Sequence, residues 1–237
     1  MRNLQDKIVW ITGSGRGIGR AAAMALAREG AKVVVSARTG EEIKTVVREI
    51  ESIGGQAVAF VCDVTKNEQI SNLAEKVKAK WGPIDILINN AGIGIFKKIS
   101  ETTEADWEKM MNINLKGAFL CSRAVLPDMA ERKSGHIINV VSVAGKQPYF
   151  NCGGYCASKY GLLGFTDVLR LETRKLGIKV TAFLPGATDT AIWGDADVDH
   201  TKMMTPDQVA EGIISICCDN PNVMKEEVVI RPIGGDL

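Results

Sequence analysis

Short apolar runs alternate with amphipathic stretches from one end of the chain to the other. The apolar runs are rich in Val, Ile and Ala, which favours β-strands. We expect strands at 7–12, 31–36, 57–62, 84–89, 136–142, 178–184 and 227–231. The stretches between them repeat apolar residues at helical spacing, and we expect helices at 17–29, 40–53, 66–81, 103–132, 154–176 and 206–219. Glycines stand where C-terminal helix caps favour them, at Gly30, Gly54, Gly82 and Gly177.

This order of elements predicts one α/β domain. Continuous apolar strands separated by helices are typical of a parallel sheet that is covered on both faces. Because crossovers between parallel strands are right-handed, we expect a Rossmann-type doubly wound fold with a seven-stranded parallel sheet. The 237 residues contain no short repeat, low-complexity tract or long linker, so we expect a single domain over 1–237. The least regular stretch, 186–204, is predicted to be a lid over the substrate, with a disordered surface excursion as the alternative.

Composition narrows the classes of function. A formal net charge of +1 leaves no basic excess for binding a nucleic acid. The first residues lack the apolar segment of a secretory signal, and no apolar run reaches the roughly 18 residues of a membrane span, so we expect a cytoplasmic protein. Six cysteines without a Cys-x-x-Cys pair and only two histidines predict no metal site. Cys152 and Cys156 are either redox-sensing thiols one turn apart or, as we favour, small buried apolar residues.

A glycine-rich turn separates the first expected strand from the first expected helix. It reads Thr-Gly-Ser-Gly-Arg-Gly-Ile-Gly from Thr12 to Gly19. Glycines let backbone amides approach a pyrophosphate, and the helix that follows offers unpaired N–H groups and a positive dipole. The alternative is a glycine-rich turn without a ligand. The candidate dinucleotide-binding residues here are Gly13, Ser14, Arg16, Gly17, Ile18 and Gly19.

The end of the second expected strand bears on the choice of coenzyme. A carboxylate there, about 20 residues after the glycines, would bind the ribose 2′-hydroxyl of NAD. This chain has Ala37 at that place, followed by Arg38. Arg16 and Arg38 can form charge-assisted contacts with a 2′-phosphate, so NADP(H) is favoured and NAD(H) is the alternative. In the competing interpretation both arginines are solvated surface cations.

A hydroxyl, a phenol and an ammonium group are spaced as in a carbonyl/alcohol redox site. Tyr155 and Lys159 stand at i and i+4 of an expected helix, so their side chains project from one face. A phenol titrates near 10, and a nearby ammonium group is expected to lower that pKa toward neutrality. Ser142 follows the fifth strand and adds a second hydrogen-bond donor. An isolated Tyr-x-x-x-Lys pair would more often be a plain helix face, but here it accompanies the glycine turn.

These motifs resemble those of the short-chain dehydrogenase/reductase family over essentially the whole chain. The further matches are Asp63-Val64, Asn89-Asn90-Ala91-Gly92, Asn112-Ile113-Asn114-Leu115 and Pro185-Gly186. In length and motifs the chain is most similar to the 3-oxoacyl-carrier-protein reductase branch. The resemblance implies that Ser142 binds the substrate oxygen, that Tyr155 transfers the proton, and that Lys159 holds the nicotinamide ribose.

The resemblance also assigns roles outside the catalytic group. It implies that Asp63 binds the adenine amino group with Val64 packed nearby, and that Asn90, Ala91 and Gly92 brace the strand beside the ribose. Asn114 would lie at a break in the long helix 103–132 and hold a water for proton relay; the alternative is a polar residue on an exposed turn.

Four residues after the sixth strand complete the implied coenzyme site. Pro185 and Gly186 would turn the chain over the nicotinamide, with Thr188 and Thr190 facing the carboxamide. Thr188 departs from the commoner Val or Ile. The candidate substrate-pocket walls are mostly apolar: Ile93, Ile95, Val143, Ala144, Tyr149, Phe150, Cys152, Ala187, Ile192, Trp193 and Met203.

The sequence therefore predicts an NADP(H)-dependent oxidoreductase that interconverts a ketone or aldehyde and an alcohol. The substrate is a 3-oxoacyl group in one interpretation and a small ketone, steroid, sugar or pterin in the other; a non-catalytic dinucleotide sensor is a third. The resemblance implies an acidic acyl carrier docking on basic residues near the cleft, for which the candidates are Arg132, Lys133, Arg174 and Lys175. It also implies a homodimer or homotetramer built through helices 103–132 and 154–176 and strand 228–231.

Overall fold

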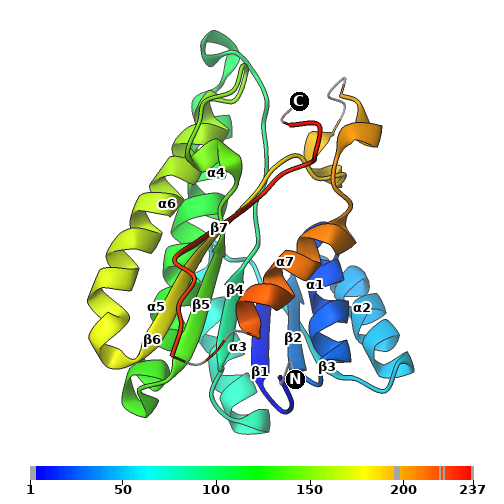
Figure 1. The fold of residues 1–237 in the computed structure, drawn as a ribbon, viewed down its shortest axis with the longest axis vertical. Coiled ribbons are helices and arrows are strands. Elements are labelled where there is room, and N and C mark those ends of the chain that lie inside the picture. Colours follow the sequence, from blue (N-terminus) through cyan, green and yellow to red (C-terminus); the bar gives the residue numbers. More distant parts are fainter. Residues whose placement is uncertain (1–3, 195–197, 219, 221, 236–237) are drawn as a thin grey trace.

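The computed structural model describes residues 4–194, 198–218, 220 and 222–235. Seven strands form one parallel sheet in the order β3-β2-β1-β4-β5-β6-β7, which confirms the predicted doubly wound fold (Figure 1). The order reverses between β1 and β4, and ligands of such sheets bind at this switch point, outside the carboxyl ends of the strands. The strands are β1 Ile8–Thr12, β2 Lys32–Ala37, β3 Gln56–Val61, β4 Ile86–Asn89, β5 Gly135–Val140, β6 Ile178–Pro185 and β7 Glu227–Ile230.

Helices cover both faces of the sheet, and alternate strand residues point to each face. Val9 and Ile11 of β1 belong to the core under α1, α2 and α7, whereas Ile8 and Trp10 belong to the core under α3, α5 and α6. In Figure 1 α1, α2 and α7 lie together on one side of the sheet. The helices are α1 Gly17–Arg28, α2 Gly40–Ser52, α3 Asn67–Trp81, α4 Glu104–Met110, α5 Gly117–Arg132, α6 Gly153–Thr173 and α7 Pro206–Cys217.

The main departure from the predicted helices is in 103–132. There α4 and α5 are joined by a π-helical segment, Met111–Lys116, which is the break expected around Asn114. Strand β5 ends at Val140, so Ser142 lies beyond the strand and not at its last position. The four glycines expected at helix ends, residues 30, 54, 82 and 177, all have positive φ. Residue 219 of the predicted last helix lies outside the described residues.

The segment after β6 contains two short 3₁₀ turns, Ala191–Trp193 and His200–Lys202. A backbone bridge between Thr188 and Met204 and a 2.7 Å contact between Asp189 Oδ1 and His200 Nδ1 hold its two ends together. Residues 195–197 of the predicted 186–204 lid lie outside the described part.

Two properties of the described residues bear on membranes and metals. None of the helices there has the length and apolar character needed to cross a bilayer. The same residues contain no group of three or more His, Cys, Asp or Glu side chains placed to hold a metal ion.

Candidate active site

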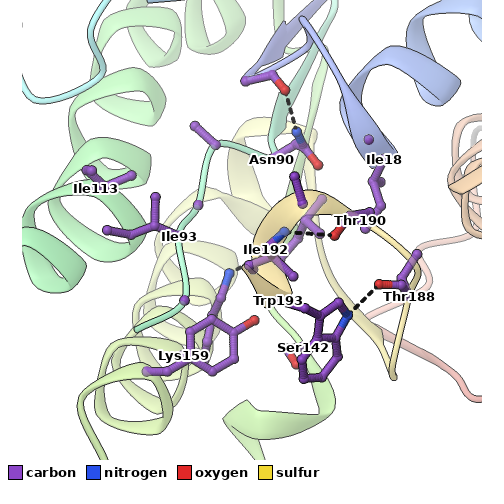
Figure 2. A pocket seen from close by; sticks show the side chains of 18 of the residues that line it. Ile18, Asn90, Ile93, Ile113, Ser142, Lys159, Thr188, Thr190, Ile192 and Trp193 are labelled. Atoms are coloured by element: carbon purple, nitrogen blue, oxygen red, sulfur yellow. Dashed lines mark hydrogen bonds between the residues drawn. The ribbon is translucent and has the colours of Figure 1, made fainter. Parts of the chain in front are cut away.

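A cleft of about 1180 Å³ opens at the carboxyl ends of the strands. Its lining comes from the segments that follow β1 to β6, so it runs from the glycine-rich turn to the Tyr155 helix. Figure 2 shows Ile18, Asn90, Ser142, Lys159 and Thr190 around this space. The fold thus brings the two predicted half-sites, dinucleotide and catalytic, into one cavity.

The glycine-rich turn is fixed by its contact with the segment after β4. Gly13 has φ +64°, and a Cβ added there would lie 2.8 Å from the Cα of Ala91. Asn90 Nδ2 donates hydrogen bonds to the carbonyls of Thr12 and Gly13, at 2.9 and 3.1 Å. The backbone N–H of Ala91 donates to Thr12 Oγ1 at 3.0 Å. Asn90 and Ala91 therefore brace the glycine turn, whereas the resemblance implied that they brace the strand; their place beside the ribose stays a prediction.

Two of the candidates in this turn do not line the cleft. The Ser14 hydroxyl donates to the carbonyl of Ile11 at 2.8 Å and accepts from the backbone N–H of Ser36 at 2.9 Å. Gly19 is buried, and a Cβ there would lie 2.5 Å from Asn90 Nδ2. Ser14 and Gly19 therefore pack against the protein side of the turn. The cavity is lined instead by Gly13, Arg16, Gly17 and Ile18.

Two arginines line the end of the cleft beside β2. Arg16 and Arg38 line the cavity and are exposed, and neither forms an ion pair with any described residue. By contrast, Arg20, one turn further along α1, binds Glu49 at 2.8 Å. Unpaired guanidinium groups at this place are available for an anionic ligand.

Sequence reasoning missed a carboxylate at the same end. Glu42, in the first turn of α2, lines the cavity. Its Oε2 lies 2.8 Å from the position of a Cβ on Gly15, and the Cβ of Ala37 is close to the same point at 3.6 Å. An acid does therefore reach the end of β2, but from the neighbouring helix. Its position within the Gly40-Glu41-Glu42 run was the available signal.

Asp63 and Val64 follow β3 and also line the cavity. Asp63 Oδ1 accepts from the N–H and the hydroxyl of Thr65, both at 2.9 Å, which fixes the carboxylate. Val64 is buried, and its Cγ2 would lie 2.8 Å from a Cβ on Gly117. The adenine-binding assignment of Asp63 stays a prediction.

Helix α6 places Tyr155 and Lys159 on one face, one turn apart, as the spacing predicted. The Lys159 ammonium donates to the carbonyl of Val140 at 3.0 Å. Burial raises the pKa of Tyr155 to about 12, partly opposed by a hydrogen bond with Ser142. Burial lowers the pKa of Lys159 to about 8. The expected lowering of the tyrosine pKa by the lysine is thus wrong for the protein alone, because desolvation dominates.

Asn114 is buried in the π-helical segment and not on an exposed turn, so the surface alternative is wrong. Its Oδ1 accepts from the N–H of Ile93 at 2.8 Å, and its Nδ2 donates to the carbonyl of Ile93 and to Ser158 Oγ, both at 2.9 Å. A Cβ on Gly92 would lie 3.5 Å from Asn114 Oδ1 and 3.6 Å from Lys159 Nζ. Gly92 therefore lies against both polar groups.

Ser142 has an unusual backbone. Its φ is +151°, a region that residues other than glycine rarely occupy. The Ser142 hydroxyl accepts from the N–H of Ala144 at 3.1 Å, which orients the side chain. Such strain is found mostly at functional positions.

The segment after β6 crosses the cleft. Pro185, Gly186, Thr188 and Thr190 all line the cavity. Thr188 Oγ1 donates to the carbonyl of Gly186 at 3.0 Å, and its own carbonyl accepts from Trp193 Nε1 at 2.8 Å (Figure 2). Thr190 Cγ2 lies 3.3 Å from the position of a Cβ on Gly17. This segment thus connects the glycine turn with the catalytic end.

Most of the predicted substrate walls line the cavity, but Ile95 and Met203 do not. The main residue that the sequence missed is Phe96, whose ring packs edge-on against Tyr155 with centroids 5.6 Å apart. The same ring stacks on Trp193 at 5.4 Å. No local pattern marks Phe96, because its partners come from distant segments.

The predicted carrier-docking residues are not near the cleft, so that expectation is wrong. Arg132 ends α5 and donates to the carbonyl of Ile84 at 2.7 Å, just before β4 begins. Arg174 belongs to the short turn that precedes β6. Lys133 and Lys175 adjoin these residues. All four therefore lie toward the amino ends of the strands, opposite the cavity.

The comparisons with known proteins agree with this geometry. A profile of the short chain dehydrogenase family matches residues 7–200. The chain belongs to this family. An uncharacterized oxidoreductase of Staphylococcus saprophyticus is 38% identical over 235 residues, which cover 98% of this chain and 100% of the relative. The sepiapterin reductase of Chlorobaculum tepidum is 33% identical over 238 residues, which cover 97% and 98%.

A solved structure of a metagenomic short-chain oxidoreductase in complex with NADP superposes with a TM-score of 0.85. It is 34% identical, and the match covers 97% of this chain and 98% of that chain. The predicted family and reaction class are confirmed: this short-chain dehydrogenase is an oxidoreductase.

Proposed function

We propose that this short-chain dehydrogenase interconverts a ketone or aldehyde and the corresponding alcohol, with NADP(H) as the hydride carrier. The observation that carries the proposal is the meeting of Ser142, Tyr155 and Lys159 in the same cavity as the glycine-rich turn. A cavity holding only one of these halves would support either binding or catalysis, but not both.

The adenosine and phosphate end fits NADP(H). The glycine turn leaves backbone exposed to the cavity, and beside it Arg16 and Arg38 form no ion pair within the described part of the chain, which suits a 2′-phosphate. The related metagenomic oxidoreductase binds NADP, which supports the same coenzyme here. We assign the pyrophosphate to the turn, the 2′-phosphate to the two arginines, and the adenine to Asp63 and Val64. When bound, NADPH would supply the hydride that adds to the carbonyl carbon, and the coenzyme would be left oxidised as NADP⁺.

Side chains of the protein bind the carbonyl oxygen of the substrate and supply the proton that it takes up. Ser142 and Tyr155 donate hydrogen bonds to the carbonyl oxygen, where negative charge develops as the carbon is reduced. A Tyr155 pKa of about 12 keeps the phenol protonated at neutral pH, so it is able to give that oxygen its proton. Lys159 is assigned to the nicotinamide ribose and Asn114 to a proton relay, with Gly92 lying against both groups. Pro185, Gly186, Thr188 and Thr190 would close over the carboxamide.

Reduction is the expected direction with an NADPH-type site. The basic residues expected to bind an acyl carrier lie away from the cavity, so they no longer support a 3-oxoacyl substrate. The interpretation as a reductase of a small ketone, steroid, sugar or pterin is supported by the apolar lining and by the similarity to a sepiapterin reductase.

Replacement of the phenol tests the reaction. Tyr155→Phe should abolish NADPH oxidation against a panel of ketones and leave NADPH binding, followed by coenzyme fluorescence, nearly unchanged. Tyr160→Phe is the matched control, because Tyr160 lies on the same helix, does not line the cavity and is 44% exposed. Substantial turnover by the Tyr155 variant would contradict the catalytic assignment. A wild type that binds NADPH but reduces no carbonyl would favour the dinucleotide sensor.

Coenzyme choice has its own test. Arg38→Asp should shift preference toward NADH by removing a phosphate contact and adding repulsion. Equal coenzyme preference in the wild type and the variant would remove Arg38 from the phosphate site.

The same proposal includes a homodimer or homotetramer. Helices α5 and α6 carry exposed apolar side chains, including Phe119 at 39%, Val168 at 53% and Leu171 at 69% exposure. Such groups are typical of an interface between copies. Sedimentation of the full chain should give a dimer or tetramer, and Leu171→Glu should weaken it.

A further inference from the structure

Aromatic side chains gather at the catalytic end of the cavity. Aromatic residues make up 5% of the chain, yet four partly buried ones line this one end, Phe96, Tyr149, Tyr155 and Trp193, together with Phe150, which is 99% exposed. They come from the segments after β4 and β5, from α6, and from the turn after β6. Convergence of separate segments on one place indicates a built wall of the site.

Phe96 is the centre of this wall. One edge of its ring meets Tyr155 at a centroid distance of 5.6 Å and an interplanar angle of 72°. Its face lies against Trp193 at 5.4 Å and 28°. The Trp193 indole is held in turn by its hydrogen bond to the carbonyl of Thr188, at 2.8 Å. A substrate whose carbonyl reaches Tyr155 therefore places its substituent beside two oriented aromatic rings.

Charge in the lining is segregated. The charged side chains that line the described cavity are Arg16, Arg38, Glu42, Asp63 and Lys159. The first four belong to the dinucleotide end, and Lys159 is the one at the catalytic end. Among the described residues, a carboxylate or phosphate on the substrate would thus have no dedicated counter-ion there, whereas a neutral flat ring would have stacking partners.

We infer that the substrate is a neutral ketone with a planar aromatic or heteroaromatic ring next to its carbonyl, bound against Phe96 and Trp193. This rests on the proposed carbonyl reduction. Stacking and edge contacts have preferred geometries that a saturated ring of the same size does not satisfy. The wall therefore selects for flatness as well as for size.

Matched substrates and variants test this inference. Acetophenone and cyclohexyl methyl ketone differ in the flatness of one six-membered ring, and kcat/KM with NADPH is measured for both. Their ratio in wild type includes intrinsic reactivity, so the informative quantity is its change on mutation. Trp193→Leu and Phe96→Leu should each lower the aryl-to-cyclohexyl ratio about tenfold, mostly through KM.

Trp107→Leu is the control, since Trp107 lies on α4 outside this cavity and is 44% exposed. Its ratio should equal that of wild type. An unchanged ratio in both the Trp193 and the Phe96 variants would overturn the inference. Failure of the wild type to reduce any ketone would instead defeat the proposed function, so the two failures are distinguishable.

A separate observation concerns Glu42. Its half-buried carboxylate lines the adenosine end, lies against Gly15, and forms no ion pair with a described residue. Ala37 leaves the strand end without the usual acid, and Glu42 brings an acceptor to the same place from α2. Glu41, its neighbour, instead pairs with Lys44 at 2.7 Å on the surface.

The geometry points to Glu42 as a residue that determines coenzyme specificity, by accepting a hydrogen bond from an adenosine 2′-hydroxyl and repelling a 2′-phosphate. The enzyme would then use NADH as well as NADPH. The direct test is a substitution that removes the negative charge of Glu42 and keeps the shape of its side chain. Glu42→Gln should raise the NADPH-to-NADH ratio of kcat/KM fivefold or more, through KM and not kcat.

Glu41→Gln is the matched control and should leave the ratio unchanged. An unchanged ratio in Glu42→Gln would overturn the assignment. A fall in the ratio would overturn it too, since it would mean that Glu42 orients an arginine toward the phosphate. Both measurements need only one carbonyl substrate that turns over.

Discussion

The ammonium group of Lys159 lies 5.7 Å from the centre of the Tyr155 ring and donates its hydrogen bond to the carbonyl of Val140. The lysine is thus held beside the phenol ring by the backbone just below Ser142. In this arrangement desolvation, and not the charge of the lysine, has the largest effect on the pKa of Tyr155, which rises to about 12. The helix spacing brings Tyr155 and Lys159 together, and their burial in the folded protein determines the pKa of each side chain.

The first prediction is that the phenol of Tyr155 ionises only at high pH in the coenzyme-free protein. Its raised pKa keeps the phenol neutral where an ordinary tyrosine, near 10, is already half ionised. The difference in tyrosinate absorbance between wild type and Tyr155→Phe should therefore be flat up to about pH 10.5. A difference signal that titrates below pH 9 would show that Lys159 lowers the pKa after all.

Local patterns in the sequence were enough to predict the fold and the proximity of Tyr155 and Lys159. All seven strands were predicted, because each is a short apolar run between helix signals. Tyr155 and Lys159 fall on one helix, so i and i+4 geometry alone predicts their proximity. Gly13 and Asn90, which the motifs predicted at the coenzyme site, both line the cavity.

What sequence reasoning missed depends on contacts between distant segments. Phe96 gains its place from Tyr155 and Trp193, and Glu42 from Gly15, none of which is a sequence neighbour. The direction of the Tyr155 pKa shift depends on desolvation by the assembled site. No periodicity encodes such relationships.

The second prediction concerns the glycine turn. Gly13→Ala combines a left-handed φ of +64° with a Cβ 2.8 Å from the Cα of Ala91, so backbone must move. We expect a loss of about 1–3 kcal/mol in the free energy of unfolding, measured with urea, together with weaker NADPH binding.

Gly164→Ala is the matched control for that substitution. It lies within α6, and a Cβ there meets no heavy atom within 4 Å. The same change should leave coenzyme binding intact and raise stability by up to about 1 kcal/mol, because alanine is the better helix former. Equal effects of the two substitutions would contradict the proposed role of the turn.

The third prediction concerns Asn114. Its amide satisfies the N–H and carbonyl of Ile93 and the hydroxyl of Ser158. Asn114→Ala leaves these buried groups without that partner, so we expect a loss of about 1–3 kcal/mol in urea unfolding and a fall in kcat larger than any change in KM. Ser158→Ala removes one of these contacts and should have a smaller effect on both. Full kcat in the Asn114 variant would exclude it from the proton relay.

The fourth prediction concerns stability in acid. His136 is buried, and its Nε2 lies 2.9 Å from the hydroxyl of Thr181. That hydroxyl donates to the carbonyl of Lys225 at 2.7 Å, so it accepts from His136, and the ring carries its proton on Nε2. Burial, aided by the charge of Lys179, lowers the pKa of His136 from 6.5 to about 3.

Below pH 6.5 the unfolded chain therefore binds a proton at residue 136 that the folded protein does not take up until about pH 3, so stability falls as pH falls through this window. Between pH 6.5 and 5 the loss should be about 1.7 kcal/mol in urea unfolding. His200→Gln removes the chain's other histidine, which is exposed, and should keep the full slope. His136→Gln should flatten it, whatever its stability at pH 7. If the His136 variant kept the slope and the His200 variant lost it, the exposed ring, not the buried one, would be the acid-sensitive group.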